Sequence, residues 1–261
     1  MLDTLSRPAL NDQQRDFYRQ QGFLVLRHLF AAELMAEADA DAETLLQRHD
    51  LIAVENLRCR WQTNVHTGAC TFETFDPVID LSPVCSRIAH DARLLAVLAD
   101  LYGDEACLFK DKLIFKPPGV KGYGLHQDWI AWTGFPRSFL TVLVPLDRAD
   151  ADNGCTQVFP GYHKNGSLST EDGQYHELPA ELIDESRCVN LELDPGDVAI
   201  FGGFTPHRSA PNRSTRWRRQ LYLSYNKHSD GGRQRDKHYE EFHRWLRVKY
   251  GEYGKKNLYF R

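Results

Sequence analysis

The spacing of hydrophobic residues changes along this chain, from a helical period in the first hundred residues to short alternating runs after them. Asn11 or Asp12 can cap a helix that continues to Gln21 and ends at Gly22. The apolar residues at 23–26 follow directly and predict a short strand. The N-terminal region is therefore expected to begin with a helix and a strand.

Two longer helices are predicted before residue 103. Residues 31–48 have the apolar spacing and the composition of an amphipathic helix. Ser82 and Pro83 open another helix, which runs to Tyr102 and ends at Gly103. Its apolar stripe contains Ile88, Leu94, Leu95, Val97, Leu98 and Leu101.

From residue 112 to residue 226 the pattern favours short strands separated by turn residues. The strand-like runs are 112–116, 139–146, 156–159, 188–193, 198–201 and 218–226. Short strands divided by Pro and Gly predict a barrel or a double-sheet jelly roll. A last helix at about 236–250, before Gly251, is expected to pack against the outside.

The length favours one domain over residues 1–261, because no long linker, repeat or low-complexity tract divides the chain. Within it we expect a helix-rich part at about 1–103, a jelly-roll core at about 104–228 and the C-terminal helix. The predicted fold class is mainly β with flanking helices.

The overall charge argues against a nucleic-acid or membrane-surface binder. The net charge is −4 and the sequence pI is near 6.3. The first fourteen residues carry Asp3, Arg7 and Asp12 and contain no apolar run, and no segment is long enough to span a bilayer. We therefore expect a soluble, cytoplasmic protein whose partner is a small molecule, with no nucleic acid and no membrane.

The cysteines do not suggest a disulfide framework or a zinc site. The six residues contain no C-x-x-C pair and lie mostly in apolar or strand-like runs. Buried free thiols are the favoured interpretation. The six are Cys59, Cys70, Cys85, Cys107, Cys155 and Cys188.

The most informative polar residues are His126 and Asp128, with His207 far downstream. Residues i and i+2 of a strand point to the same face, so the first pair can approach one ion together while His207 supplies a third ligand. Two imidazoles and one carboxylate on one side of a metal leave the other positions open, which suits non-haem Fe(II) oxygenases. His207 after Thr205 and Pro206 also fits a turn histidine bonded to backbone, and only its partnership with the upstream pair favours the metal role.

A second H-x-D motif, His228 to Asp230, is interpreted as surface. It precedes Gly231 and Gly232 in a charged stretch that predicts a loop. The motif at 126–128 instead follows a strand-like run and precedes another. We therefore take the first motif as the site.

The run that begins at Arg218, eleven residues after His207, alternates polar and apolar positions. Leu221 and Leu223 share one face, which suits a core. The other face is either the solvent side of a sheet or the lining of a site, and the nearby His207 favours the site. That face carries Arg218, Gln220, Tyr222, Ser224 and Asn226.

These residues resemble the phytanoyl-CoA dioxygenase family of Fe(II)/2-oxoglutarate oxygenases. The resemblance covers about the second half of the chain, and its segments stand in family order. They are Lys116-Pro117-Pro118, His126-Gln127-Asp128, Asn153-Gly154-Cys155 with Phe159 to Lys164, Pro206 to Ser209, and Arg218.

The resemblance implies a double-stranded β-helix, a cupin-like jelly roll, and an enzyme that hydroxylates with Fe(II), 2-oxoglutarate and O2. Iron would be held by His126, Asp128 and His207. Arg218, chosen over Arg219 by the family spacing, would bind the distal carboxylate of 2-oxoglutarate through its planar fork. Further cosubstrate residues would be Ser209, Lys116 and Thr141.

The substrate prediction rests on residues near these motifs. Trp129 and Arg137 follow the first two ligands, and Gln62 and Asn64 alternate in the N-terminal half, so these four are candidate substrate residues. Aromatic residues after the motif suit core packing equally well. The nearby cations favour a small anionic metabolite, for example an aminoalkylphosphonate or an amino-acid derivative, over a long acyl-CoA.

Two other classes of protein remain open from the sequence. A cupin-like metalloenzyme that does not use 2-oxoglutarate would need His126, Asp128 and His207 but would be indifferent to Arg218. A non-catalytic jelly-roll binding module would need none of the four.

Overall fold

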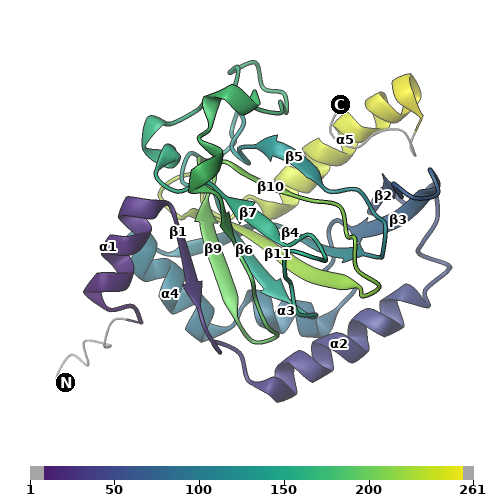
Figure 1. Ribbon diagram of the computed structural model, residues 1–261, viewed down its shortest axis with the longest axis horizontal. Helices are drawn as coiled ribbons and strands as arrows, with labels where there is room; N and C mark the ends of the chain where they lie inside the picture. Colours follow the sequence, from purple (N-terminus) through teal and green to yellow (C-terminus); the bar gives the residue numbers. More distant parts are fainter. Residues whose placement is uncertain (1–8, 255–261) are drawn as a thin grey trace.

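Two antiparallel sheets carry the fold of the computed structural model, which describes residues 9–254 (Figure 1). The larger sheet has seven strands in the order β1-β9-β6-β11-β4-β3-β2, and the smaller has four in the order β5-β10-β7-β8. The sheets do not close into a barrel. The predicted fold class, mainly β with flanking helices around a cupin-like jelly-roll core, is confirmed.

The elements are named in chain order. The strands are β1 (Phe23–Leu26), β2 (Cys59–Thr63), β3 (Cys70–Phe75), β4 (Ala106–Lys116), β5 (Tyr123–His126), β6 (Leu140–Pro145), β7 (Thr156–Val158), β8 (Val189–Asn190), β9 (Val198–Gly202), β10 (His207–Ser209) and β11 (Arg218–Lys227). The helices are α1 (Asp12–Gln21), α2 (Ala32–Leu46), α3 (Pro83–Ala89), α4 (Ala92–Tyr102) and α5 (Arg235–Tyr253), with short 3-10 turns at Tyr162–Asn165, Ala180–Leu182 and Glu185–Arg187.

The first helix begins and ends where the sequence predicts. The Asn11 side chain accepts a hydrogen bond from the backbone of Gln14, whose side chain accepts one in return, and this capping box satisfies two free donors. Gly22 ends the helix with φ of 82°, a left-handed conformation that glycine adopts without a steric penalty.

The predicted helix from Ser82 to Tyr102 is wrong as one element, because the chain forms α3 and α4 instead. Asp91 has extended backbone angles, and its carboxylate accepts a hydrogen bond of 2.9 Å from the backbone of Arg93. An aspartate that caps a new helix in this way ends the preceding one. Ser82 caps α3 as expected.

Helices α2, α3 and α4 cover the outer face of the larger sheet. Residues of α2, α3 and α4 pack with Leu113, Val142 and Leu221 in the main core. A second apolar cluster, which includes Leu143, Val158 and Phe201, packs between the two sheets beside a cavity. The alternation in β11 is therefore confirmed, since its leucines face the helices and its polar residues face the interior.

Three strands come from the N-terminal part: β1, which the sequence predicts at 23–26, and β2 and β3, which it does not. Strand β1 pairs with β9 at one edge of the larger sheet, while β2 and β3 extend the other edge next to β4. A bulge interrupts the pairing of β2 and β3, because Arg60 lies opposite Thr74 and Trp61 lies opposite Phe72. Glu73 is thus the unpaired residue of the bulge.

Helix α5 lies beside β4 (Figure 1). Its residues His238, Phe242 and Trp245 close one side of the cavity between the sheets. Arg235 Nε contacts the buried Asp111 Oδ2 at 2.6 Å, and the Tyr239 hydroxyl donates to Asp111 O at 2.7 Å. The helix is therefore part of the site, and not only an outer layer as the sequence suggested.

Two findings concern the chain as a whole. No helix within residues 9–254 has both the length and the apolar character required to cross a membrane. None of the six cysteines, all of which lie within the described residues, forms a disulfide, and Cys59, Cys85, Cys107 and Cys155 are buried. Residues 1–8, which belong to the segment predicted to lack a secretion signal, lie outside the described part.

Candidate metal centre

Two adjacent strands of the smaller sheet bring His126 and His207 together. Strand β5 ends at His126, β10 begins at His207, and the two residues lie opposite each other in the antiparallel register. Their ring centroids are 4.2 Å apart. Strand pairing thus brings together two histidines that 80 residues separate in the sequence.

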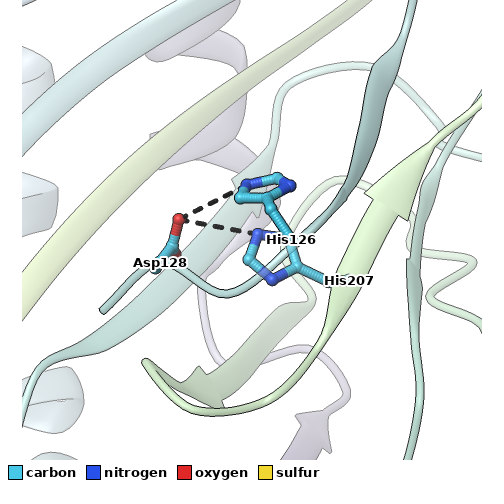
Figure 2. A group of neighbouring side chains, drawn as sticks. All are labelled: His126, Asp128 and His207. Atoms are coloured by element: carbon cyan, nitrogen blue, oxygen red, sulfur yellow. Dashed lines mark ion pairs between the residues drawn. The ribbon is translucent and has the colours of Figure 1, made fainter. Parts of the chain in front are cut away.

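Asp128 completes the cluster just after β5 (Figure 2). Its Oδ1 lies 3.7 Å from His126 Nε2 and 3.6 Å from His207 Nε2. The ligand atoms of the three residues all lie within 4.8 Å of one another, so they can hold one metal ion. A set of two imidazoles and one carboxylate suits Fe(II).

Backbone carbonyls fix the orientation of both imidazoles. His126 Nδ1 lies 2.8 Å from Gly124 O, and His207 Nδ1 lies 3.0 Å from Thr205 O. A carbonyl only accepts, so each Nδ1 carries the proton and each Nε2 keeps a lone pair for the metal. Burial, with His126 alongside, lowers the pKa of His207 to about 4, which keeps this imidazole neutral.

Thr141 on β6 orients the carboxylate. Its hydroxyl donates a hydrogen bond of 2.6 Å to Asp128 Oδ2, which leaves Oδ1 facing the imidazoles. Burial by itself raises the pKa of Asp128, but His207 and His126 outweigh that effect and hold the pKa below its ordinary value. The carboxylate is therefore ionised and available as a ligand.

Gln127 anchors the loop around this centre. Its amide donates to Gly166 O at 2.9 Å and to Phe204 O at 2.6 Å, and its oxygen accepts from the backbone of Leu168 at 2.7 Å. Because side chains alternate along an extended chain, Gln127 points away from the metal side. The middle residue of the motif thus has a structural function that the spacing of the ligands did not reveal.

Arg218 and Lys116 lie opposite each other where β11 and β4 pair, and both are fully buried. Arg218 Nη1 donates to Gly154 O at 3.0 Å, while its Nε and Nη2 have no partner among the described residues. Lys116 Nζ lies 3.3 Å from Ser209 Oγ. Buried guanidinium donors without a partner fit a carboxylate ligand, since they would otherwise be costly.

A cavity of about 480 Å³ adjoins the metal cluster. Its walls include Tyr222 and Ser224 from β11, Tyr175 from a loop, and Ser209 from β10. The side toward α5 is aromatic and is formed by Trp132, Phe135, His238, Phe242 and Trp245. A volume of this size matches small-molecule sites.

One cation in the cavity wall has no counter-ion. Lys110 contacts Asp76 at 3.0 Å, and Arg208 contacts Glu185 at 2.7 Å. Lys112 forms no ion pair or hydrogen bond within the described part of the chain, and its ammonium lies 5.1 Å from the centre of the Tyr222 ring. Its positive charge is therefore free to attract an anion.

The four candidate substrate residues do not line this cavity. Side chains alternate along the extended chain, so Asp128 points inward and Trp129 points away from the cavity. There Trp129 is buried, and the Arg137 guanidinium lies 4.9 Å from its ring. Asn64 accepts hydrogen bonds from His66 and Thr67 in a turn, and Gln62 accepts one from the backbone of Thr63. The nearby Trp132 and Phe135 do line the cavity.

The second H-x-D motif is structural. His228 and Ser229 are exposed in a turn, and Asp230 accepts a hydrogen bond of 2.7 Å from the backbone of Ser138. The residues that the sequence missed are Lys112, Tyr175, Glu73 and the aromatic side chains of α5. For α5 the signal was present, since His238, Phe242 and Trp245 recur at helical spacing on one face.

Comparison with known proteins agrees with this geometry. The sequence profile of the family described as phytanoyl-CoA dioxygenase (PhyH) matches residues 18–220, so the chain belongs to that family. It is an Fe(II)- and 2-oxoglutarate-dependent dioxygenase. The resemblance seen in the sequence is confirmed.

Two relatives cover most of the chain. A 2-aminoethylphosphonate dioxygenase from the uncultured bacterium HF130_AEPn_1 is 30% identical over 233 residues, which are 86% of this chain and 84% of the relative. A methylphosphonate hydroxylase from Gimesia maris is 28% identical over 239 residues, which are 85% and 83% of the two chains. Among solved structures, the epimerase SnoN with Fe3+, alpha ketoglutarate and nogalamycin RO has a TM-score of 0.70 at 20% identity, over 85% of each chain.

Proposed function

We propose that this dioxygenase hydroxylates an unactivated C–H bond of a small, polar, anionic metabolite and releases succinate and CO2. An aminoalkylphosphonate or an amino-acid derivative is the favoured class of substrate. The observation that carries this proposal is Lys112, a cation without a counter-ion in the wall of a small cavity beside the metal cluster.

Iron would be held by His126, Asp128 and His207. Bound iron and 2-oxoglutarate would supply the oxidising chemistry that activates O2. The protein fixes the geometry: two carbonyls set the imidazole tautomers, and Thr141 sets the carboxylate.

The distal carboxylate of 2-oxoglutarate would lie against Arg218. Its Nε and Nη2 present adjacent donors, and Lys116 with Ser209 adds positive charge and a hydroxyl. This site supports 2-oxoglutarate over the cupin-like alternative, in which two buried donors of Arg218 would have no function. Thr141 donates its hydrogen bond to Asp128, so its role would be to orient this metal ligand.

Lys112 would attract the anionic group of the substrate. Lys112 lines the same cavity as His126, Asp128 and His207. The aromatic wall that includes Phe242 and Trp245 would exclude water and pack against the carbon chain. The two phosphonate-acting relatives, by their names, act on small anions, which supports the same class here.

The cofactor class is tested first by adding Fe(II) and 2-oxoglutarate to metal-free protein without oxygen. We expect the weak visible charge-transfer band of an iron-bound keto acid. The band should be lost or weakened in Asp128→Ala and in Arg218→Ala. Stoichiometric iron binding without a band would favour the cupin-like alternative, and folded protein that binds no iron would refute the proposal.

The substrate class is tested with a panel of aminoalkylphosphonates, amino-acid derivatives and acyl-CoA thioesters. For each compound, the amount of succinate released is compared with the amount of substrate consumed. Lys112→Gln should raise KM for the anionic substrate at least about tenfold. Lys121→Gln removes the same charge at an exposed position outside the cavity and should leave KM unchanged. Turnover of acyl-CoA thioesters alone would contradict the proposed class.

A further inference from the structure

Glu73 is a fully buried carboxylate with no part in the chemistry described so far. It is the extra residue of the bulge between β2 and β3. Its neighbours Phe72 and Phe75 both pack toward the outer core, although a regular strand would turn residues three apart to opposite faces. The bulge re-aims Glu73 toward the interior, as bulges near active sites commonly do.

Inside, Glu73 has one hydrogen-bond partner. The Tyr123 hydroxyl donates to its Oε2 at 2.5 Å, while Oε1 has no partner within residues 9–254. A distance this short is typical of a hydroxyl bonded to an ionised carboxylate. Tyr123 lines the cavity, and its backbone nitrogen lies 3.3 Å from Ser209 Oγ. Glu73 therefore lies directly behind the wall of the site.

The charges nearest to Glu73 belong to the predicted cosubstrate pocket. Lys116, Arg218 and Lys112 all act electrostatically on its carboxylate. Burial raises the pKa of Glu73 above its ordinary value, and Tyr123 together with these cations offsets part of that increase. Among the groups that act on the pKa of Lys116, Glu73 supplies the only carboxylate in the described part of the protein.

The contacts of Lys116 show why a counter-ion is needed. Its Nζ contacts Gly154 O, Ser209 Oγ and Ala210 O, and the three protons of an ammonium would satisfy all three contacts. Burial and the neighbouring Arg218 lower the pKa of Lys116 well below its ordinary value, and Glu73 opposes that decrease, so the ammonium form of this buried side chain depends on the nearby carboxylate. Two buried cations without a negative charge would be strongly destabilising.

We propose that Glu73 is a positioning residue of the cosubstrate pocket: held by Tyr123, it neutralises Lys116, so that of the paired cations Lys116 and Arg218 it is Arg218 that keeps its charge for a ligand. A ligand with a single distal carboxylate then completes the charge balance at this end of the site. This inference rests on the proposed function, because it takes Arg218 as the receptor of 2-oxoglutarate.

The test compares two keto acids on wild-type protein and on Glu73→Gln. Glutamine keeps the shape and an acceptor oxygen for Tyr123 but removes the charge. The dissociation constant is measured with Fe(II) in the absence of oxygen, from the visible band, for 2-oxoglutarate and for 2-oxopentanoate, which has a methyl group in place of the distal carboxylate. We expect Glu73→Gln to bind 2-oxoglutarate about tenfold more tightly and 2-oxopentanoate with less than about twofold change.

The control is Glu55→Gln, which removes an exposed carboxylate that has no ion pair or hydrogen bond within the described residues. It should change neither constant. An unchanged affinity of Glu73→Gln for 2-oxoglutarate, or an equal change for both keto acids, would overturn the inference. A wild-type protein that binds neither iron nor keto acid would instead refute the proposed function.

If Glu73→Gln does not fold, Tyr123→Phe provides a second test. It keeps the charge but frees Glu73 to approach Arg218 and compete with the ligand. We expect 2-oxoglutarate to bind several-fold more weakly while 2-oxopentanoate is unaffected. An unchanged constant for 2-oxoglutarate in this variant would contradict the assigned role.

Discussion

The hydroxyl of Thr141 donates a 2.6 Å hydrogen bond to Oδ2 of Asp128, so one oxygen of the carboxylate is engaged and the other faces the two imidazoles. Thr141 comes from β6 in the larger sheet, whereas the histidines belong to the smaller sheet. The metal centre is therefore held across both layers of the fold.

Thr141→Val removes this hydrogen bond and keeps the shape of the side chain. Without it, the carboxylate can rotate away from the imidazoles, and we expect the affinity for Fe(II) to fall about tenfold or more. Anaerobic iron titration measures the change. Thr141→Ser retains the hydroxyl and should bind iron nearly as tightly as wild type; equal losses in both variants would argue against the hydrogen bond as the cause.

Arg218→Lys keeps the charge but loses the planar fork. We expect the apparent KM for 2-oxoglutarate to rise at least about tenfold while iron affinity stays within about twofold, because two parallel hydrogen bonds become one. Initial rates at varied 2-oxoglutarate measure this. Arg213→Lys, in the loop before β11, serves as the control, and an unchanged KM in Arg218→Lys would count against its assigned role.

Arg235→Ala tests how α5 is held. The substitution leaves the buried carboxylate of Asp111 without its cation, so the free energy of unfolding should fall by about 3 kcal/mol. Substrate KM should also rise as the aromatic wall loosens. Urea denaturation provides the first measurement. Arg244→Ala removes an exposed pair with Glu240 on the same helix and should cost less than about 1 kcal/mol.

His238→Phe should reduce the sensitivity of the metal-free protein to acid. Burial, with Lys110 nearby, lowers the pKa of His238 to about 3, below the ordinary value of 6.5. Below pH 6.5 His238 is protonated in the unfolded chain but stays neutral in the folded protein. The free energy of unfolding therefore decreases as the pH falls toward 3. The slope from this group is at most about 1.4 kcal/mol per pH unit.

Phenylalanine removes this titration but keeps the stacking on Phe242. His207, whose pKa is also lowered, titrates in both proteins, so their difference isolates His238. Urea denaturation at several pH values between 7 and 4.5 provides the comparison. Parallel pH profiles for wild type and variant would contradict the prediction.

The sequence by itself determined the elements and residues whose signals are local. Capping residues placed α1, alternation placed β11 with its polar face inward, and the two-residue spacing placed His126 and Asp128 on one side. The same alternation, applied one residue further, turns Trp129 away from the cavity, whereas its position next to the motif had led to its prediction as a substrate residue. The fold class also followed from the sequence, because short strands with turn residues between them have few stable arrangements.

Only the tertiary structure decided which distant segments meet. The register of β5 and β10 puts His207 against His126, the docking of α5 through Arg235 brings Phe242 to the cavity, and the bulge turns Glu73 inward. Each of these contacts depends on pairing or packing between residues far apart in the chain. The spacing of hydrophobic and polar residues along the sequence does not reveal such contacts. Burial then determines the chemistry of these contacts. When neighbours from other elements take the place of the water around a carboxylate or a cation, those neighbours set its pKa and its binding partners.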